Sequence, residues 1–279
     1  MLNADIKKLL EERRFGVVTE KLYEDPELVG NLVDFLEAAD SKTQAGILTI
    51  LGRYGFDHPQ LVYPHVEAIM QVLEKNDSLK SDVACAMGNL VFNSREKSAE
   101  VIPMLEELFH DEDSFLRQDA AAAMGNIGFN FPDLVEEDIP GLIAMLESDD
   151  EDEQETGAQA LGKIGINSPE IIRETFPRLV SVLSHAKEAS CGGIISAFGA
   201  LGFHYPEMVR EQIPNLIEYL HSTNPVAVRN AVMALGIIGM NNPDLIEPAV
   251  PDLLKLTSDP DREIRLNAMV AISRSGDSK

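Results

Sequence analysis

A single spacing organises most of this chain. Glycine recurs every 37 residues within similar short segments, from MGNLVFNS to LGIIGMNNPDLI. The glycines in step are Gly88, Gly125, Gly162, Gly199 and Gly236, and Gly52 lies 36 residues before the first of them. Prolines keep the same interval in two further columns, from Pro132 to Pro243 and from Pro103 to Pro251. A fixed period of this length predicts an architecture of stacked structural repeats.

Each repeat has the pattern of two helices. In the segment 139–148, apolar residues fall at positions i, i+3, i+4 and i+7, which is the spacing of one helical face. Pro140 fits the first turn of that helix, where a missing N–H costs nothing. A polar connector and an alanine-rich second helix follow. We therefore predict an all-α, right-handed α-solenoid of about seven helical-hairpin repeats over residues 26–279, with residues 1–25 as an N-terminal helical cap.

Recurring glycines and polar residues suggest how the helices end and meet. A helical glycine costs about 1 kcal/mol relative to alanine, so the first glycine column indicates helix backbones that approach closely. The second glycine, three residues later, is expected to be a left-handed C-terminal cap. After the second glycine comes a column of polar residues, and three residues after each of them stands an acid or Gln. This is capping-box spacing, so we expect the polar column to cap the next helix. That column comprises Asp57, Asn93, Asn130, Asn167, His204 and Asn241.

Two segments carry a resemblance to known families. The first-helix segment IPGLIAMLE and the second-helix segment FLRQDAAAAMGNIG resemble the HEAT and armadillo families of α-solenoids. An arginine early in the second helix, at Arg117 and Arg265, is similar to HEAT repeats, whereas the PDLVEE-type element before the first helix is more armadillo-like. Both subclasses therefore stay open. The resemblance implies a protein-binding scaffold, and in armadillo proteins an asparagine ladder on the second helices holds an extended peptide.

The charge of the chain restricts its partners. It has 47 Asp and Glu against 23 Lys and Arg, a net charge of −24. A field of that sign repels nucleic acid and anionic membranes. No apolar run approaches the roughly 18 residues of a membrane span, and the N-terminal segment lacks the apolar core of a secretory signal. Cys85 and Cys191 are expected to be buried free thiols, so we predict a cytoplasmic protein.

No motif of enzyme chemistry stands out. The sequence has no nucleophile elbow, no phosphate-binding glycine loop and no CxxC pair. His110, His185 and His221 fall near the connectors between paired helices, where we expect solvated side chains and no metal. We therefore predict no catalytic residue, no metal and no cofactor.

One stripe of the second helices is the candidate partner-binding surface. In each repeat it consists of the residue directly after the first glycine and of the residues four and seven positions before that residue, which share one helical face. Packing between repeats and a partner groove are both compatible with it. The candidate residues are Asp82, Asn89, Asp119, Asn126, Thr156, Gln159, Lys163 and Asn230.

An acidic stretch and a glycine pair interrupt the regular pattern. Residues 131–155 contain eleven acids and no Lys or Arg, and the densest run falls in a connector. We predict an acidic edge there that favours a basic partner segment, with a solvated loop as the alternative. The edge comprises Asp149, Asp150, Glu151, Asp152 and Glu153. Gly192 and Gly193 are expected inside a second helix, where they would weaken it or permit close packing.

These patterns favour a non-enzymatic adaptor that binds another protein or peptide on its second helices. The alternative is a HEAT-like accessory enzyme or lyase subunit whose site has no recognisable motif. A third hypothesis is that the acidity is an adaptation to a salty cytoplasm. Nothing in the sequence identifies the partner or an oligomeric state.

Overall fold

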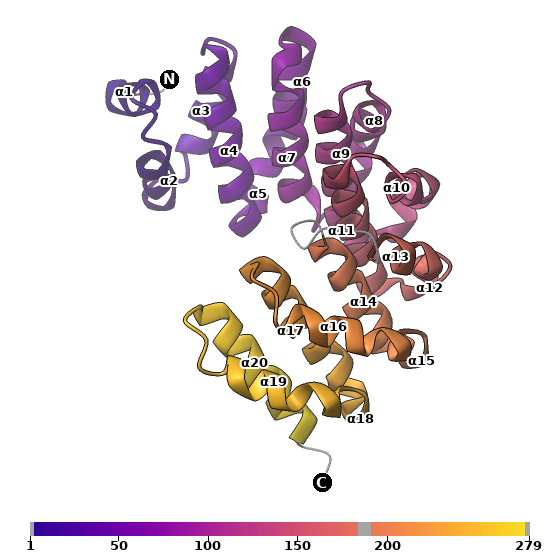
Figure 1. The fold of residues 1–279 in the computed structure, drawn as a ribbon. Coiled ribbons are helices and arrows are strands. Elements are labelled where there is room, and N and C mark those ends of the chain that lie inside the picture. Colours follow the sequence, from indigo (N-terminus) through magenta and orange to yellow (C-terminus); the bar gives the residue numbers. More distant parts are fainter. Residues whose placement is uncertain (1–2, 184–190, 277–279) are drawn as a thin grey trace. The chain divides into compact units, whose positions relative to one another are not determined.

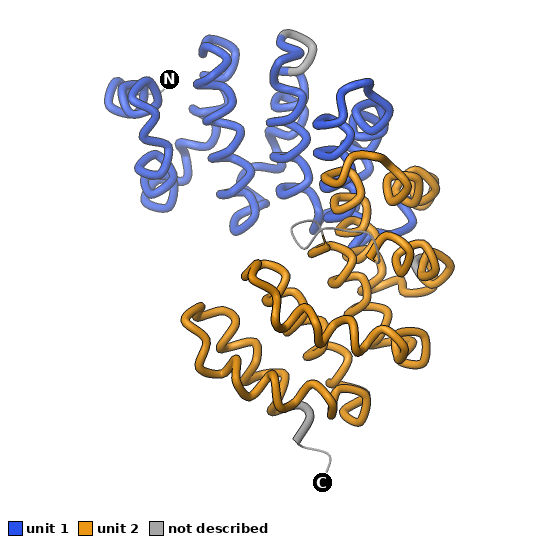
Figure 2. Tube along the Cα trace, viewed as in Figure 1, with its two compact units in different colours: residues 1–135 blue, residues 136–279 orange. Residues whose placement is uncertain are grey.

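The structure is a computed structural model that describes residues 3–183 and 191–276. Every regular element in these residues is a helix (Figure 1). The chain divides into two compact units, residues 1–135 and residues 136–279 (Figure 2). In both units a shorter helix, here called an A-helix, is usually followed by a longer one, called a B-helix.

The first unit begins with two helices that precede the paired ones. Its elements are α1 (Ala4–Glu11), α2 (Phe15–Glu24), α3 (Leu28–Leu36), α4 (Ser41–Asp57), α5 (Pro59–Val62), α6 (Val66–Lys75), α7 (Lys80–Val91), α8 (Arg95–Phe109) and α9 (Ser114–Asn130). The A-helices α3, α6 and α8 pack against the B-helices α4, α7 and α9, which stack in that order. Helices α1 and α2 pack on α4 and bury Leu10 and Leu22 completely.

The second unit repeats the same arrangement. Its elements are α10 (Ile139–Met145), α11 (Glu151–Asn167), α12 (Pro169–Arg173), α13 (Phe176–Leu183), α14 (Gly192–His204), α15 (Pro206–Val209), α16 (Ile213–Tyr219), α17 (Pro225–Asn241), α18 (Pro243–Ile246), α19 (Val250–Leu256) and α20 (Arg262–Gly276). The B-helices α11, α14, α17 and α20 pack on their own A-helices, and each packs on the B-helix next to it in this order. Apolar side chains between these layers form the core.

The first glycine column is where successive B-helices touch. A Cβ atom built on Gly88 of α7 would lie 2.6 Å from the Cα of Ala123 in α9. In the second unit, a Cβ atom on Gly162 of α11 would lie 3.2 Å from the Cα of Ala197 in α14. The same glycine–alanine pairing recurs at Gly52, Gly199 and Gly236. The predicted close approach of helix backbones is therefore confirmed.

The second glycine column does not cap the helices. No described glycine has a positive φ angle, and Gly55 and Gly239 lie inside α4 and α17. A Cβ atom on Gly55 would lie 2.4 Å from the Leu90 Cδ1 atom of α7. The predicted left-handed cap is wrong, because these glycines make room for a large side chain from a neighbouring helix.

The polar column after the glycines was also misassigned. Its members mostly end their own B-helix, so they cannot cap the next one: Asn130 is the last residue of α9 and Asn241 of α17. The Asn130 amide donates to the Phe92 carbonyl at 2.8 Å, and the Asn241 amide donates to the Phe203 carbonyl at 3.4 Å. The column therefore ties a B-helix to the end of the preceding one.

Helix capping is done by other residues. The Ser94 hydroxyl accepts from the Lys97 N–H and caps α8, next to the expected Asn93. Asp40 and Asp113 cap the B-helices α4 and α9 from the A–B connectors. Several short helices after the B-helices begin with proline, whose missing N–H costs nothing in a first helical turn, and have no side-chain cap hydrogen bond.

Gly192 and Gly193 begin a B-helix instead of interrupting one. Helix α14 starts at Gly192, and residues 184–190 of the preceding connector, including His185, lie outside the described residues. A Cβ atom on Gly193 would lie 2.6 Å from the Glu155 carbonyl oxygen of α11. Close packing of α14 on α11 accounts for this glycine.

The glycine–alanine contact can be tested by substitution. We expect Gly88→Ala to lower the free energy of unfolding by about 1–3 kcal/mol because the added methyl group overpacks the contact, despite a gain of about 1 kcal/mol in helix propensity. Gly30→Ala is the matched control, since its Cβ atom would lie no closer than 3.6 Å to His65. Urea denaturation followed by circular dichroism measures both, and equal stability of the two variants would contradict the proposed contact.

Candidate partner-binding surface

In the first unit, the structure brings the candidate residues of α7 and α9 together. The Asn126 amide donates to the Asn89 Oδ1 atom at 3.4 Å. One turn away, the Cys85 thiol donates to the Asp119 Oδ1 atom at 3.4 Å. Asp82 lies beside this pair, and its pKa is raised by desolvation and by the negative charge of Asp119. This part of the stripe is polar, and its side chains bind one another across the two B-helices.

Cys85 is exposed, which corrects the expectation of a buried thiol. Its position on the outer stripe of α7 places the sulfur atom beside two carboxylates. Desolvation by the packed helices and the charges of Asp119 and Asp82 raise the pKa of Cys85 to about 12. Cys191 is buried, as predicted.

In the second unit, the stripe lines a groove of about 750 Å³. We call it the α11–α17 groove, because its lining residues come from α11 and α17 and from α14, the helix that packs between them. Figure 1 shows these three helices. It contains three candidate residues, Gln159, Lys163 and Asn230. Thr156 does not line the groove, and its hydroxyl donates to the Asp152 carbonyl of its own helix at 2.8 Å.

The groove follows from differences in side-chain size at equivalent positions. In α11 the positions are Glu155, Gln159 and Lys163; the residues 37 positions later, in α14, are Gly192, Ser196 and Ala200. A further 37 residues on, in α17, they are Arg229, Met233 and Ile237. The middle helix thus has small residues between two helices with long ones, which leaves a hollow along α14.

The α17 wall of the groove is apolar and open to solvent. Met233 and Met240 are 46% and 45% exposed, and on the opposite wall Ile166 of α11 is 43% exposed. Ile237 and Phe203 are partly exposed beside them. The candidate residues predicted from the sequence are the polar members of the stripe, and they do not include these apolar residues. The signal was present, since Met233, Ile237 and Met240 follow the spacing i, i+4, i+7, a second apolar face of α17.

The polar wall has opposite charges near its two ends. Desolvation lowers the pKa of Lys163, which lines the groove. Glu155 lies at the end of the groove near Gly192, and desolvation raises its pKa although the Gln159 amide donates to it at 2.9 Å. Among the described residues that line the groove none is Asp or Glu, and Glu155 lies just outside this lining, beside Gly192.

The acidic edge divides into structural and exposed members. Asp150 caps α11 by accepting from the N–H groups of Asp152 and Glu153. The Glu153 side chain is buried, and its Oε2 atom accepts from the Ser148 hydroxyl at 2.6 Å. Asp149 and Asp152 are exposed, and Glu151 is partly exposed. Only part of the predicted edge is therefore exposed to solvent.

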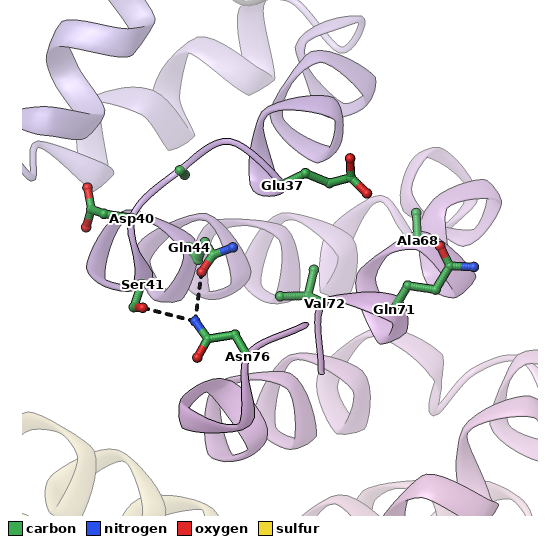
Figure 3. A pocket seen from close by; sticks show the side chains of 9 residues that line it. Glu37, Asp40, Ser41, Gln44, Ala68, Gln71, Val72 and Asn76 are labelled. Carbon is green, nitrogen blue, oxygen red and sulfur yellow. Dashed lines mark hydrogen bonds between the residues drawn. The ribbon is translucent and has the colours of Figure 1, made fainter. Parts of the chain in front are cut away.

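A smaller cavity of about 410 Å³ lies at the A–B connectors of α4 and α7 (Figure 3). The Asn76 amide donates to the Ser41 hydroxyl and to the Gln44 Oε1 atom, both at 3.0 Å. The Gln44 amide donates in turn to the Leu36 carbonyl at 2.8 Å. These polar groups bind one another and join neighbouring connectors, so the cavity has a structural role.

The described ranges are residues 3–183 and 191–276. No group of His, Cys, Asp or Glu side chains there has the arrangement of a metal site. No helix in those ranges has both the length and the apolar character needed to cross a bilayer. His110 is exposed, and the exposed His221 ring lies 3.2 Å from the Asp252 carboxylate.

The pKa of Cys85 leads to a test of the first unit. Because the thiolate is the reactive form, we expect iodoacetamide to label Cys85 at pH 8 at least roughly tenfold more slowly than an ordinary exposed thiol. Asp119→Asn should lower the pKa and accelerate labelling, since it removes a negative charge and a charged hydrogen-bond acceptor. Mass spectrometry of labelling rates between pH 7 and pH 10 measures this. Labelling of the wild type as fast as free cysteine would contradict it.

Comparisons with known proteins agree with this architecture. An engineered protein of known crystal structure matches with a TM-score of 0.56 and 21% sequence identity, over 88% of this chain and 68% of that one. A computationally designed armadillo repeat protein for modular peptide recognition is also similar, with a TM-score of 0.49 and 18% identity over 88% of this chain and 98% of that one. Among curated protein sequences, none matches this chain.

The family is shown by a sequence model. The model for HEAT repeats matches residues 66–162 and 213–279, which together make up more than half of the chain. With the engineered neighbour, this match confirms the predicted α-solenoid of HEAT or armadillo type. The structure shows stacked helical pairs whose B-helices are in contact, and the sequence match shows that the chain belongs to the HEAT repeat family.

Proposed function

We propose that this protein is a non-enzymatic scaffold that binds a partner protein or peptide on its B-helices. The observation that carries the proposal is the α11–α17 groove, whose apolar wall exposes Met233 and Met240. HEAT repeat proteins generally mediate protein–protein interactions. A concave surface with several exposed apolar side chains is typical of such binding sites.

The chemistry of the groove supports binding over catalysis. Ser196 and His204 are the lining residues that most resemble a nucleophile and a base. The Ser196 hydroxyl donates to the Gly192 carbonyl at 3.0 Å, and the His204 Nε2 atom lies 3.2 Å from the Ile166 carbonyl oxygen. Both groups thus contact backbone carbonyls and do not form a nucleophile–base pair.

We also propose that the exposed part of the acidic edge attracts a basic partner segment. Asp149 and Asp152 lie at the start of α11, the helix that forms the polar wall of the groove. Exposed charges of this kind accelerate association more than they tighten a complex. The net charge of −24 adds a long-range field of the same sign.

The remaining proposals concern organisation and location. The 37-residue period continues from Gly125 to Gly162, which supports one continuous set of repeats over residues 26–279 with residues 1–25 as its cap.

Two free cysteines support a reducing, cytoplasmic location.

Photo-crosslinking tests the proposed groove in cells of the source organism. A photoreactive amino acid at Met233 should capture a partner, whereas the same residue at the exposed Leu254 of α19 should not. With that partner purified, we expect Met233→Ser with Met240→Ser to weaken binding at least roughly tenfold, because two apolar contacts are lost. Isothermal titration calorimetry measures the affinity.

The matched control for this pair is Leu254→Ser, which removes an equally exposed apolar side chain outside the groove. All variants should keep the wild-type circular dichroism spectrum. If the partner binds the double variant and the wild type equally well, the groove is not its binding site.

The acidic edge requires a separate test that spares the helix cap. We expect Asp149→Ser with Asp152→Ser to slow association with the same partner several-fold at low salt and to flatten its salt dependence, with little change in the dissociation rate. Stopped-flow measurements at two salt concentrations give both rates. Asp150 is left unchanged because losing its cap would cost about 1 kcal/mol of stability. An unchanged association rate would exclude electrostatic attraction by this edge.

A further inference from the structure

The two walls of the α11–α17 groove differ in chemistry, and this difference limits what can bind there. The α11 wall presents the polar Gln159 and Lys163 and, beyond Lys163, the apolar Ile166 to the groove, and Glu155 lies beside Gly192 at the other end. The α17 wall presents Met233, Ile237 and Met240. A segment that binds between them therefore needs apolar side chains on one side and polar groups on the other.

The polar wall also has a negative charge near one end and a positive charge farther along. Glu155 and Lys163 are eight residues apart on α11, which corresponds to about 12 Å along a helix axis. They share one stripe of the helix with Gln159 between them. An occupant that places a positive group near Glu155 and a negative group near Lys163 pairs with both charges in a partly desolvated site, where charge pairs are stronger than in water.

The two walls approach one another over a glycine at the end of the groove near Glu155. A Cβ atom on Gly192 would lie 2.6 Å from the Asn230 Nδ2 atom and 3.1 Å from the Glu155 Oε1 atom. Any larger residue would therefore collide with these two side chains. Glycine thus leaves room for the carboxylate of one wall and the amide of the other at the same end of the groove.

Side-chain amides on both walls favour an extended occupant, whose backbone N–H and C=O groups need partners. An extended chain covers about 12 Å with about four residues, and the amides of Gln159 and Asn230 are suitable partners for its backbone.

We propose that the α11–α17 groove binds an extended peptide segment in which a basic side chain, apolar side chains and a carboxylate follow one another. The basic side chain pairs with Glu155, the apolar side chains contact Met233, Ile237 and Met240, and the carboxylate pairs with Lys163. This proposal rests on the proposed function and specifies the chemistry of the partner.

A library of random linear peptides displayed on phage tests the proposal with the full chain as the target. We expect the selected peptides to carry Lys or Arg and Asp or Glu about four residues apart, with apolar residues between them. For the tightest synthetic peptide, Glu155→Gln and Lys163→Met should each weaken binding about tenfold. Reselection on Glu155→Gln should lose the preference for a basic residue, and reselection on Lys163→Met should lose the preference for an acid.

Glu218→Gln in α16 and Lys255→Met in α19 are matched controls, because they remove one charge each outside the groove. Selected peptides whose affinity depends on Met233 and Met240 can still lack a base and an acid at this spacing, or bind Glu155→Gln with unchanged affinity. In either case the proposed peptide chemistry is wrong, while the proposal that the groove binds a partner stands. If no selected peptide is weakened by Met233→Ser with Met240→Ser, the groove does not bind peptides and the proposed function fails with it.

Discussion

The contact between a glycine of one B-helix and an alanine of the next is the constraint on which the rest of this structure depends. It brings helix axes closer than ordinary side chains permit, as shown by the 2.6 Å separation that a Cβ atom on Gly88 would have from Ala123. Within each unit it fixes the register of neighbouring B-helices, so equivalent residues lie side by side. The polar column that joins Asn130 to Phe92 and Asn241 to Phe203 depends on that register.

The candidate site depends on the same register. Because Glu155, Gly192 and Arg229 occupy equivalent positions, a change from long to small side chains in one helix produces a hollow between its neighbours. In α7 and α9 the equivalent stripe carries carboxylates and asparagines that bind one another, as Asn126 binds Asn89. The two units therefore share a backbone plan but present different surfaces, one polar and the other apolar with charged ends.

The sequence predicted what the repeat itself determines, namely paired helices, close approach at Gly88 and its equivalents, and the location of a surface stripe. It failed where one or two residues decide the outcome. Gly55 and Asn130 were placed beyond helix ends because spacing alone does not show where a helix stops. The groove was missed because it depends on comparing side-chain sizes across three helices.

The small floor of the groove has a consequence for how such proteins diversify. Ser196 is exposed on this floor, whereas Gly192 and Ala200 are buried beside the neighbouring B-helices. A few substitutions at these floor positions can create or erase a cleft in a given repeat while the pattern of paired helices stays the same. In a chain of this kind, substitutions can change the position of a binding site without changing the fold.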